Sequence, residues 1–334
     1  MYYQVLQVLA DGCQYSTEQL IRQLTLSTVE LEQAIKTLIA YGVRLHSPAA
    51  NTYQLAEPVE LFDRAAILAA LPVVTRQQLK RLEIHSVLDS TNRYALTQYS
   101  DAVPYACLAE YQTAGRGRQG RQWISPIARG LCLSLKQHYA TLDKPLSGLN
   151  IAMAVTVVRV LLMLGATDVG IKWPNDILWQ GRKLAGLLLE SRCGNGCDIV
   201  YGIGINVKLY PFDSKTINQP WVDLYTVLEH SSISRNTLAA KLIDQCMQTL
   251  LIYPQVGLTA FRDDWYHFDL SYGQWVTLEI PHRLKKGNMN LNSLMENKEY
   301  VKGTACGIDD QGALLLQVGH QTQRYVYGEV SLRL

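Results

Sequence analysis

The sequence predicts an α/β protein of three domains: a winged helix-turn-helix at residues 1–60, a central mixed α/β domain at 61–270 and a small all-β barrel at 271–334. Two capped helices followed by two short strands predict the first domain. Strands interspersed with amphipathic or buried helices predict the second. Alternating apolar and polar residues between glycine turns predict the third. A chain of 334 residues is long enough for this arrangement.

The first domain is predicted from two helix-start signals. The capping boxes STEQ (16–19) and STVE (27–30) are each followed by apolar residues at helical spacing. Gly42 is expected to end the second helix. Residues 43–45 and 52–55 resemble two short strands around the turn SPAAN, as in a wing.

The central domain is expected to begin after the Glu57-Pro58 boundary. The expected strands are 83–88, 106–110, 130–135, 169–173, 177–179, 183–190 and 199–207, and the expected helices are 91–99, 151–164, 237–252 and 258–268. The turns QGR and CGNG would join the last three strands as an antiparallel meander. In the third domain, the polar residues 282–298 are expected to form a long exposed hairpin loop.

Composition excludes several classes of protein. The chain is 48% hydrophobic and 18% charged with a net charge of +2, so it has no global attraction to nucleic acid or anionic lipid. The longest apolar run, 151–164, has 14 residues interrupted by Arg159, which is too short for a bilayer and suits a buried helix. The N-terminus lacks the features of a signal peptide. We therefore expect a cytoplasmic protein with no membrane partner.

Seven cysteines are scattered along the chain. The one close pair, Cys193 and Cys197 in CGNGC, has no second pair or histidine at zinc-finger spacing, so no metal site is expected there. Reduced thiols, as in a cytoplasmic protein, are the better interpretation.

The most unusual segment is TAGRGRQGRQW at 113–123, which we call the arginine loop. It interleaves three arginines with three glycines, and no acidic residue occurs between Glu110 and Asp143. GRGRQG matches G-x-G-x-x-G, but Pro126 and Gly130 argue against the helix that a dinucleotide site requires, and no Walker lysine is present. Glycine-rich backbone is costly to order and arginine matches phosphate and carboxylate, so we predict a mobile lid that closes on an anion. A solvated basic loop is the alternative.

Two further motifs place polar residues at strand ends. KWPND (172–176) ends a strand and turns at its proline. Lys183 opens the apolar strand KLAGLLLE, in which Gly186 permits close approach of a ligand or of backbone. Each motif alone is equally compatible with a snorkelling lysine or an Asn–Asp turn.

Together, EYQTAGRGRQGRQW, KWPNDIL and RKLAGLLLE, with DSTN upstream and GIGINV downstream, closely resemble the biotin–protein ligases, and specifically the bifunctional ligase/repressors with an N-terminal winged helix. The resemblance covers nearly the whole chain. It implies a central ligase domain and a C-terminal barrel of the SH3 type. It also implies the substrates biotin and ATP, with Mg²⁺ as cofactor. Biotinyl-5′-AMP would form first, and biotin would then be transferred to a lysine of the biotin carboxyl carrier protein.

The resemblance also implies site residues. Biotin would be bound by Ser90, Thr91, Asn92, Gln112, Arg116, Gly117, Arg118, Lys183 and Gly186. The catalytic residues would be Arg118, Lys183, Lys172 and Asp176. The nucleotide would be bound by Arg118, Arg121, Asn175, Asn206, Trp221 and Arg333. Mg²⁺ would enter with ATP, near Asp176, and no metal would be held by the protein alone. Asp176 would orient the acceptor lysine rather than act as a base, because an ionised aspartate is a poor base at neutral pH.

Residues 1–60 fit DNA binding poorly in charge. They contain three basic and six acidic side chains, a net charge of −3, whereas DNA affinity depends on phosphate neutralisation. Thr28, Gln33, Lys36 and Thr37 are expected to read base edges if operator DNA is a partner. The resemblance further implies a homodimer when biotinyl-5′-AMP is bound. A monofunctional ligase with a degenerate winged helix, a lipoate or octanoyl transferase, and a biotin sensor without transferase activity are the alternatives.

Overall fold

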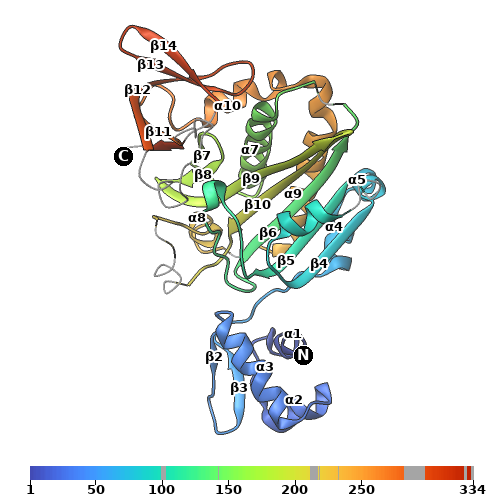
Figure 1. Ribbon diagram of the computed structural model, residues 1–334. Helices are drawn as coiled ribbons and strands as arrows, with labels where there is room; N and C mark the ends of the chain where they lie inside the picture. Colours follow the sequence, from blue (N-terminus) through green and yellow to red (C-terminus); the bar gives the residue numbers. More distant parts are fainter. Residues whose placement is uncertain are drawn as a thin grey trace, which may run out of the picture.

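A seven-stranded mixed sheet lies at the centre of the protein (Figure 1). The computed structural model describes residues 1–98, 103–141, 143–210, 217, 219–231, 233–281, 298–326 and 329–331. The strands are β4 (Arg81–Leu88), β5 (Tyr105–Gln112), β6 (Gly130–Tyr139), β7 (Val169–Lys172), β8 (Asp176–Trp179), β9 (Arg182–Gly194) and β10 (Gly196–Asn206). Their order is β4-β5-β6-β10-β9-β8-β7, in which β4 and β5 are parallel and the other neighbours antiparallel. The mixed α/β fold and the meander of β8, β9 and β10 are confirmed.

Helices cover both faces of this sheet. α7 (Leu146–Met163) and α9 (Arg235–Val256) pack against each other on one face, and α6 (Thr91–Thr97) covers the other. Successive strand residues point to opposite faces, so Ile199 joins the first core and Val200 the second. The shorter helices are α4 (Arg64–Ala70), α5 (Val73–Gln78), α8 (Leu224–Val227) and α10 (Arg262–Phe268). α4 and α5 were not expected, because helices this short show little periodicity and depend on packing against α9.

Within the described part of the chain, α7 is the one helix long and apolar enough to cross a membrane. However, 67% of it is buried inside the protein, which is typical of a core helix. It starts at Leu146, before the expected residue 151, because the polar Ser147 and Asn150 interrupt the apolar pattern of its first turn. The expectation of a buried helix is confirmed.

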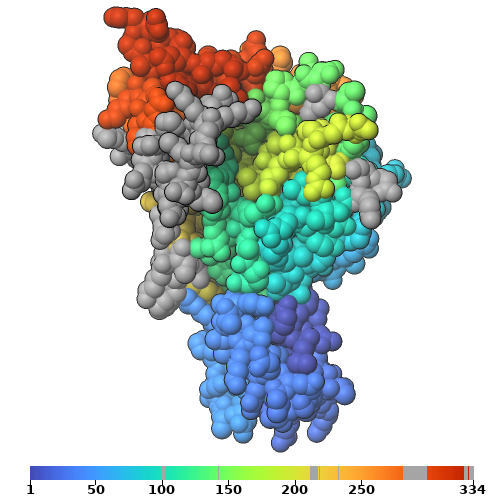
Figure 2. Space-filling model, viewed as in Figure 1, coloured from blue at the N-terminus to red at the C-terminus, as the bar shows by residue number. Residues whose placement is uncertain are grey.

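Residues at the N-terminus form a separate lobe (blue in Figures 1 and 2). It contains α1 (Tyr2–Leu9), β1 (Tyr15–Ser16), α2 (Thr17–Leu24), α3 (Thr28–Ala40), β2 (Leu45–His46) and β3 (Thr52–Leu55), with the strands in the order β1-β3-β2. Both expected capping boxes are present, and Gly42 follows α3 with a φ of +87°. The sequence reasoning missed α1 and β1.

The lobe contacts the central domain through aromatic and charged side chains. Tyr41 stacks on Tyr111 of β5 with ring centroids 4.6 Å apart. The guanidinium groups of Arg44, from the lobe, and Arg129 each lie over the ring of Tyr210, at 3.9 and 4.0 Å. These contacts attach the lobe beside the chain segment that follows β10.

The C-terminal residues form a five-stranded antiparallel sheet (red in Figure 1). Its strands are β11 (Trp275–Pro281), β12 (Lys298–Ile308), β13 (Leu314–Val318), β14 (Gln321–Tyr325) and β15 (Glu329–Ser331), in the order β14-β13-β12-β11-β15. The expectation of all-β structure is confirmed. The expected exposed loop at 282–298 lies outside the described residues except for Lys298, which begins β12.

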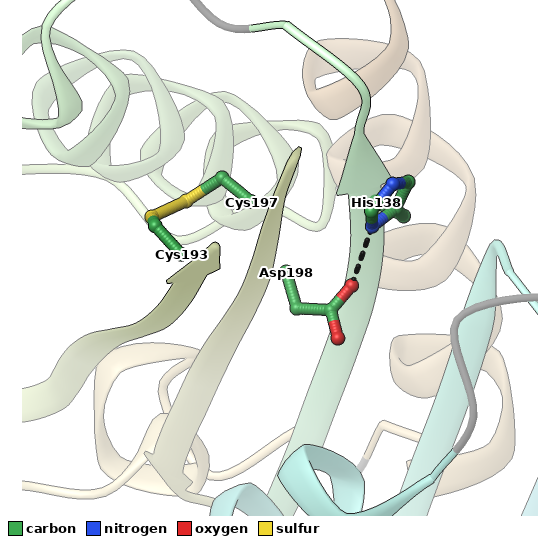
Figure 3. The surroundings of a disulfide bond; sticks show 4 residues. All are labelled: His138, Cys193, Cys197 and Asp198. Atoms are coloured by element: carbon green, nitrogen blue, oxygen red, sulfur yellow. Dashed lines mark hydrogen bonds and ion pairs between the residues drawn. A yellow bond between two sulfur atoms is a disulfide. The ribbon is translucent and has the colours of Figure 1, made fainter. Parts of the chain in front are cut away.

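The expectation of reduced thiols at Cys193 and Cys197 is wrong. The two residues form a disulfide at the tip of the β9–β10 hairpin, near the ion-paired His138 and Asp198 (Figure 3). They lie directly opposite each other in the antiparallel register, with Cα atoms 4.0 Å apart. Spacing along the chain does not reveal this register, which brings the two side chains together across the hairpin. The other five cysteines are free.

A buried ion pair joins strands of the central sheet to a helix and to the linker that follows the lobe. Arg235, at the start of α9, donates to Glu110 Oε2 of β5 at 2.9 Å, and both side chains are almost fully buried. Glu110 Oε1 accepts from the backbone N–H of Phe62 at 2.5 Å. Arg235 also donates to the carbonyl oxygens of Glu60, at 2.6 Å, and Gly130, at 2.8 Å. One ion pair therefore holds together the linker after the lobe, two strands and a helix.

We predict that Arg235→Met lowers the free energy of unfolding by about 3–5 kcal/mol, because the variant leaves the Glu110 carboxylate buried without its counter-charge. Urea denaturation followed by circular dichroism measures the change. Arg324→Met is the control, because the Arg324–Asp309 pair is partly exposed and is expected to contribute no more than about 1 kcal/mol. Equal losses for the two variants would contradict the prediction.

Candidate functional site

One pocket in the central domain collects most of the residues singled out by the sequence. It lies where α6, β5, β9, β10 and the arginine loop meet. We call it the main pocket. It is lined by Ser90, Thr91, Asn92, Gln112, Arg116, Gly117, Arg118, Arg121, Gln122, Trp123, Cys132, Leu133, Asn175, Asp176, Lys183, Gly186, Leu187, Leu188, Gly202, Ile203, Gly204 and Gln219. All nine predicted biotin-binding residues are among them.

Buried polar side chains form one end of the main pocket. Thr91 donates its backbone N–H to Gln112 Oε1 at 2.8 Å. Ser134 Oγ lies 2.8 Å from Thr91 Oγ1 and 2.6 Å from Asn92 Oδ1. Ser90 caps α6 by accepting from the backbone of Arg93, which places the start of this helix at the pocket. The network fixes the orientation of several buried donors and acceptors at this end of the pocket.

The arginine loop covers this pocket as a closed turn. The backbone N–H of Trp123 donates to Gly115 O at 2.9 Å, and that of Gly117 donates to Arg121 O at 2.6 Å. A Cβ at Gly115 would lie 2.4 Å from Trp123 O, and Gly120 has a φ of +75°, so two of the glycines serve this turn directly. Only a 3₁₀ turn, Arg118–Gly120, occurs where a dinucleotide site would begin a helix. The backbone is extended again at Arg121, so this loop does not lead into a helix.

The loop arginines have partners that are distant in sequence. Arg116 Nη2 forms an ion pair with Glu190 Oε2 at 2.7 Å, and Arg118 Nη1 lies 3.3 Å from Asn175 Oδ1. The sequence showed that no acidic residue lies nearby along the chain, but it could not show that β9 carries Glu190 to the loop.

Next to Asn175 in the chain, the carboxylate of Asp176 lies between two lysines. Asp176 Oδ1 is 2.7 Å from Lys183 Nζ, and Asp176 Oδ2 is 3.3 Å from Lys172 Nζ. Burial raises the pKa of the Asp176 carboxyl, but the charges of Lys183 and Lys172 outweigh it and hold that pKa below its usual value. Asp176 is therefore ionised at neutral pH and fixes the positions of both ammonium groups.

Two glycines of the hairpin form the floor beneath Trp123. Gly186 of β9 and Gly204 of β10 lie directly opposite each other in the register. A Cβ would lie 3.1 Å from the Trp123 ring at Gly186 and 2.5 Å from it at Gly204. Lys183 Nζ lies 5.8 Å from the centroid of the same ring. The expected close approach at Gly186 is made by Trp123, a residue of the chain itself.

A second hollow adjoins the main pocket and shares Trp123 with it as a lining residue. It is lined by Arg121, Gln122, Trp123, Ile124, Lys183, Asn206, Ile217, Gln219 and Trp221. Asn206 Nδ2 donates to the carbonyl oxygen of Val222 at 3.0 Å and lies 3.3 Å from that of Lys183, and Trp221 bridges to Lys183 through the backbone. The predicted nucleotide residues Arg121, Asn206 and Trp221 thus meet here, whereas Arg333 lies outside the described residues.

The residues predicted to contact DNA lie on a different part of the molecule. Thr28, Gln33 and Lys36 are exposed on α3. Thr37 is half-buried, and its hydroxyl donates to the carbonyl oxygen of Gln33 at 2.8 Å within the helix.

Sequence reasoning missed several residues in or directly behind the pockets, of which Glu190, Ser134, Gly202 and Gly204 have a clear structural role. Gly202 and Gly204 lie within the quoted motif GIGINV and Glu190 ends KLAGLLLE, so both motifs carried a signal that was not used. A Cβ at Gly202 would lie 2.4 Å from Asn92 Oδ1, so this glycine makes room for the polar network. Ser134 had no such signal, because its place depends on the pairing of β6 with β10.

The protein alone offers no metal site in the part that the structure describes. No group of three or more histidine, cysteine, aspartate or glutamate side chains there could hold a metal ion. Both Asp176 oxygens are already taken by lysines, so these residues do not fit a resident Mg²⁺.

Comparison with known proteins identifies close relatives. Residues 84–206 match the biotin/lipoate A/B protein ligase family and residues 290–333 match the biotin protein ligase C-terminal domain. The chain is 34% identical over 329 residues to the bifunctional ligase/repressor BirA of Escherichia coli, covering 98% of this chain and 95% of that protein. It is 29% identical over 260 residues to the biotin–[acetyl-CoA-carboxylase] ligase of Mycobacterium tuberculosis, covering 75% and 88%.

Among solved structures, the chain resembles the biotin protein ligase from Aquifex aeolicus in complex with biotin and ATP. The TM-score is 0.61 at 25% identity, and the match covers 76% of this chain and 99% of that one.

The charges around Asp176 predict a pH dependence of stability. Because its pKa in the folded protein lies below the ordinary value of 3.8, the ionised carboxylate stabilises the fold above about pH 4, and this contribution is lost as the pH falls through the folded pKa. Asp176→Asn should therefore be less stable than the parent at pH 7, and the difference should shrink as the pH is lowered below 4. Urea denaturation across this range checks it, and a difference that grows on acidification would contradict the prediction.

Proposed function

The chain belongs to the biotin–protein ligase family, and we propose that it activates biotin with ATP to biotinyl-5′-AMP and transfers the biotinyl group to a lysine of the biotin carboxyl carrier protein. One observation carries this proposal. The buried polar side chains around Thr91, the arginine loop, Asp176 and Lys183 line one pocket, which adjoins a second hollow lined by Trp221. A ligand that extends from a polar head through a carboxylate to a nucleotide would fit this order of groups.

In the first step, an oxygen of the biotin carboxylate attacks the α-phosphorus of ATP and pyrophosphate leaves. Two anions approach each other in this step, so the site must supply positive charge. Lys183 and Lys172 are held within 3.3 Å of one carboxylate and would face the reacting oxygens together with Arg118. Because the carboxylate attacks ATP directly, this step requires no covalent bond between the substrate and any side chain that the structure describes in the pocket.

In the second step, a neutral lysine amine attacks the acyl carbon of the adenylate, AMP leaves, and the amine loses a proton to the departing phosphate or to water. Asp176 is ionised and poorly basic, so its proposed role is to orient the amine and the catalytic lysines rather than to accept the proton. A mixed anhydride hydrolyses in water, and the arginine loop would exclude water until the carrier arrives. Mg²⁺ would enter bound to the phosphates of ATP.

We assign the remaining predicted roles as follows. Ser90, Thr91, Asn92 and Gln112 would hydrogen-bond the biotin head group, since all four are buried, polar and uncharged. Asn206 and Trp221 would bind adenosine, with the indole stacked on adenine. Arg121, Asn175 and, beyond the described residues, Arg333 would also contact the nucleotide.

We also propose the finer architecture and location. The helices and sheet of residues 1–60 form a winged helix, residues 61–270 form the ligase domain, and residues 271–334 form an SH3-like barrel. The order of helices and strands in each part supports this division. The protein would be cytoplasmic and would dimerise when biotinyl-5′-AMP is bound, pairing through the central sheet.

A second role as repressor of the biotin operon is supported by the full-length similarity to a bifunctional ligase/repressor. The acidic charge of the lobe opposes it less than the sequence suggested, because two of the six acidic residues face the central domain. Glu57 pairs with Lys208 at 2.7 Å, and Glu60 accepts from Ser234 Oγ at 2.6 Å. The exposed Gln33 and Lys36 remain available to contact DNA, and dimerisation would double their number.

We predict that the parent protein labels only the carrier lysine, whereas Arg118→Gly forms the adenylate and releases it roughly 10- to 150-fold faster, as expected for loss of about 1.5–3 kcal/mol of charge-assisted contact. The released adenylate would label lysines indiscriminately. Biotin-dependent exchange of ATP with pyrophosphate, followed by streptavidin blotting of carrier and bystander proteins, measures both effects. Lipoate in place of biotin is the control substrate. Exchange with lipoate alone would overturn the proposed function.

We predict that operator DNA binds in the presence of biotin and ATP, and that Lys36→Ala weakens this binding and lowers the slope of log affinity against log salt by about one per protomer. Fluorescence anisotropy with operator and scrambled duplexes measures it. Lys241→Ala, on an exposed position of α9, is the control. Equal affinity for the two duplexes would leave the protein as a monofunctional ligase.

A further inference from the structure

Glu190 occupies the junction between the arginine loop and the polar end of the main pocket. It lies on β9, and its side chain is 24% exposed. A single oxygen, Oε2, accepts from Arg116 Nη2 at 2.7 Å and from Asn92 Nδ2 at 2.9 Å. One carboxylate thus joins a cation of the loop to the helix that begins at the pocket.

The contact with Asn92 extends into the pocket. Asn92 also donates to Leu188 O at 3.1 Å and accepts from Ser134 Oγ, which in turn lies within hydrogen-bond distance of Thr91. Thr91 donates to Gln112. Glu190 therefore continues a chain of hydrogen bonds from the residues proposed to bind the biotin head group to the residue that anchors the loop.

The contact with Arg116 leaves part of its guanidinium for a ligand. Glu190 engages Nη2, while Nε of Arg116 is buried and has no hydrogen-bond partner among the described residues. Arg116 lines the main pocket. A buried donor without a partner costs about 1–3 kcal/mol, so an anion that accepts from it would gain this free energy on binding.

We propose that Glu190 is a positioning residue. Its carboxylate accepts from Nη2 of Arg116 and from Asn92, and in this way it keeps the arginine loop closed over the activated ligand without touching that ligand. This inference rests on the proposed ligase function and adds to it a determinant of adenylate retention. The opposite arrangement, in which Glu190 competes with the ligand for Arg116, predicts tighter retention when the carboxylate is removed. The Asn92 bond favours positioning, since Glu190 Oε2 is shared between Asn92 and Arg116 and is therefore held in place before a ligand binds.

The test measures release of preformed biotinyl-5′-AMP from the full-length protein, by chasing the radiolabelled adenylate with excess unlabelled biotin and ATP. Adenylate formation by the parent is measured first, and its absence would overturn the proposed ligase function separately. Glu190→Gln and Arg116→Gln should each release the adenylate about tenfold faster. For Glu190→Gln, the KM for biotin should change less than about threefold, because Glu190 does not touch the ligand.

The double variant distinguishes positioning from a general structural role. If Glu190 acts through Arg116, the double variant should release the adenylate about as fast as either single variant. Asp198→Asn is the matched control, because Asp198 is an ion-paired carboxylate on the same hairpin, facing Lys136 and His138; its release rate should equal that of the parent. Slower release by Glu190→Gln, an unchanged rate, or multiplicative effects in the double variant would overturn the proposal.

Discussion

The buried ion pair between Arg235 and Glu110 is the constraint on which the arrangement of the protein depends. Neither charge could be buried alone at an acceptable free energy, so the linker, β5, β6 and α9 must assemble together around the pair. Glu110 lies two residues before Gln112 and five before Gly115. The same pair therefore fixes the point at which the arginine loop leaves the sheet, and through it the position of the loop above the main pocket.

Balanced charge is the second feature of the site. Lys172 and Lys183 share Asp176, and Arg116 is paired with Glu190, so these cations are held in place before any substrate binds. Pre-positioned cations need not reorganise when negative charge develops between two approaching anions, which is the condition for effective electrostatic catalysis. The carboxylates thus hold the cations in place, which explains why a site that must attract anions contains the ionised Asp176.

The N-terminal lobe is attached beside the segment that leads to the second hollow. Tyr210 lies between Arg44 of the lobe and Arg129 of the central domain, and Lys208 pairs with Glu57 of the lobe. Asn206, which lines the hollow, is only four residues from Tyr210. The segment 206–210 therefore contacts both the lobe and the proposed nucleotide subsite. Glu57, an acidic residue of the lobe, helps to attach the lobe to this segment.

The sequence by itself determined the features that depend on local physics. Capping boxes set the starts of α2 and α3, glycine turns separated the strands of the meander, and the motifs around Arg118, Asn175 and Lys183 identified the pocket residues. Only the tertiary structure decided which distant residues meet. Examples are the Cys193–Cys197 disulfide, the Arg116–Glu190 ion pair and the packing of the Trp123 ring against Gly204. These contacts depend on strand register and on long-range burial of charge, neither of which is encoded in the spacing of neighbouring residues.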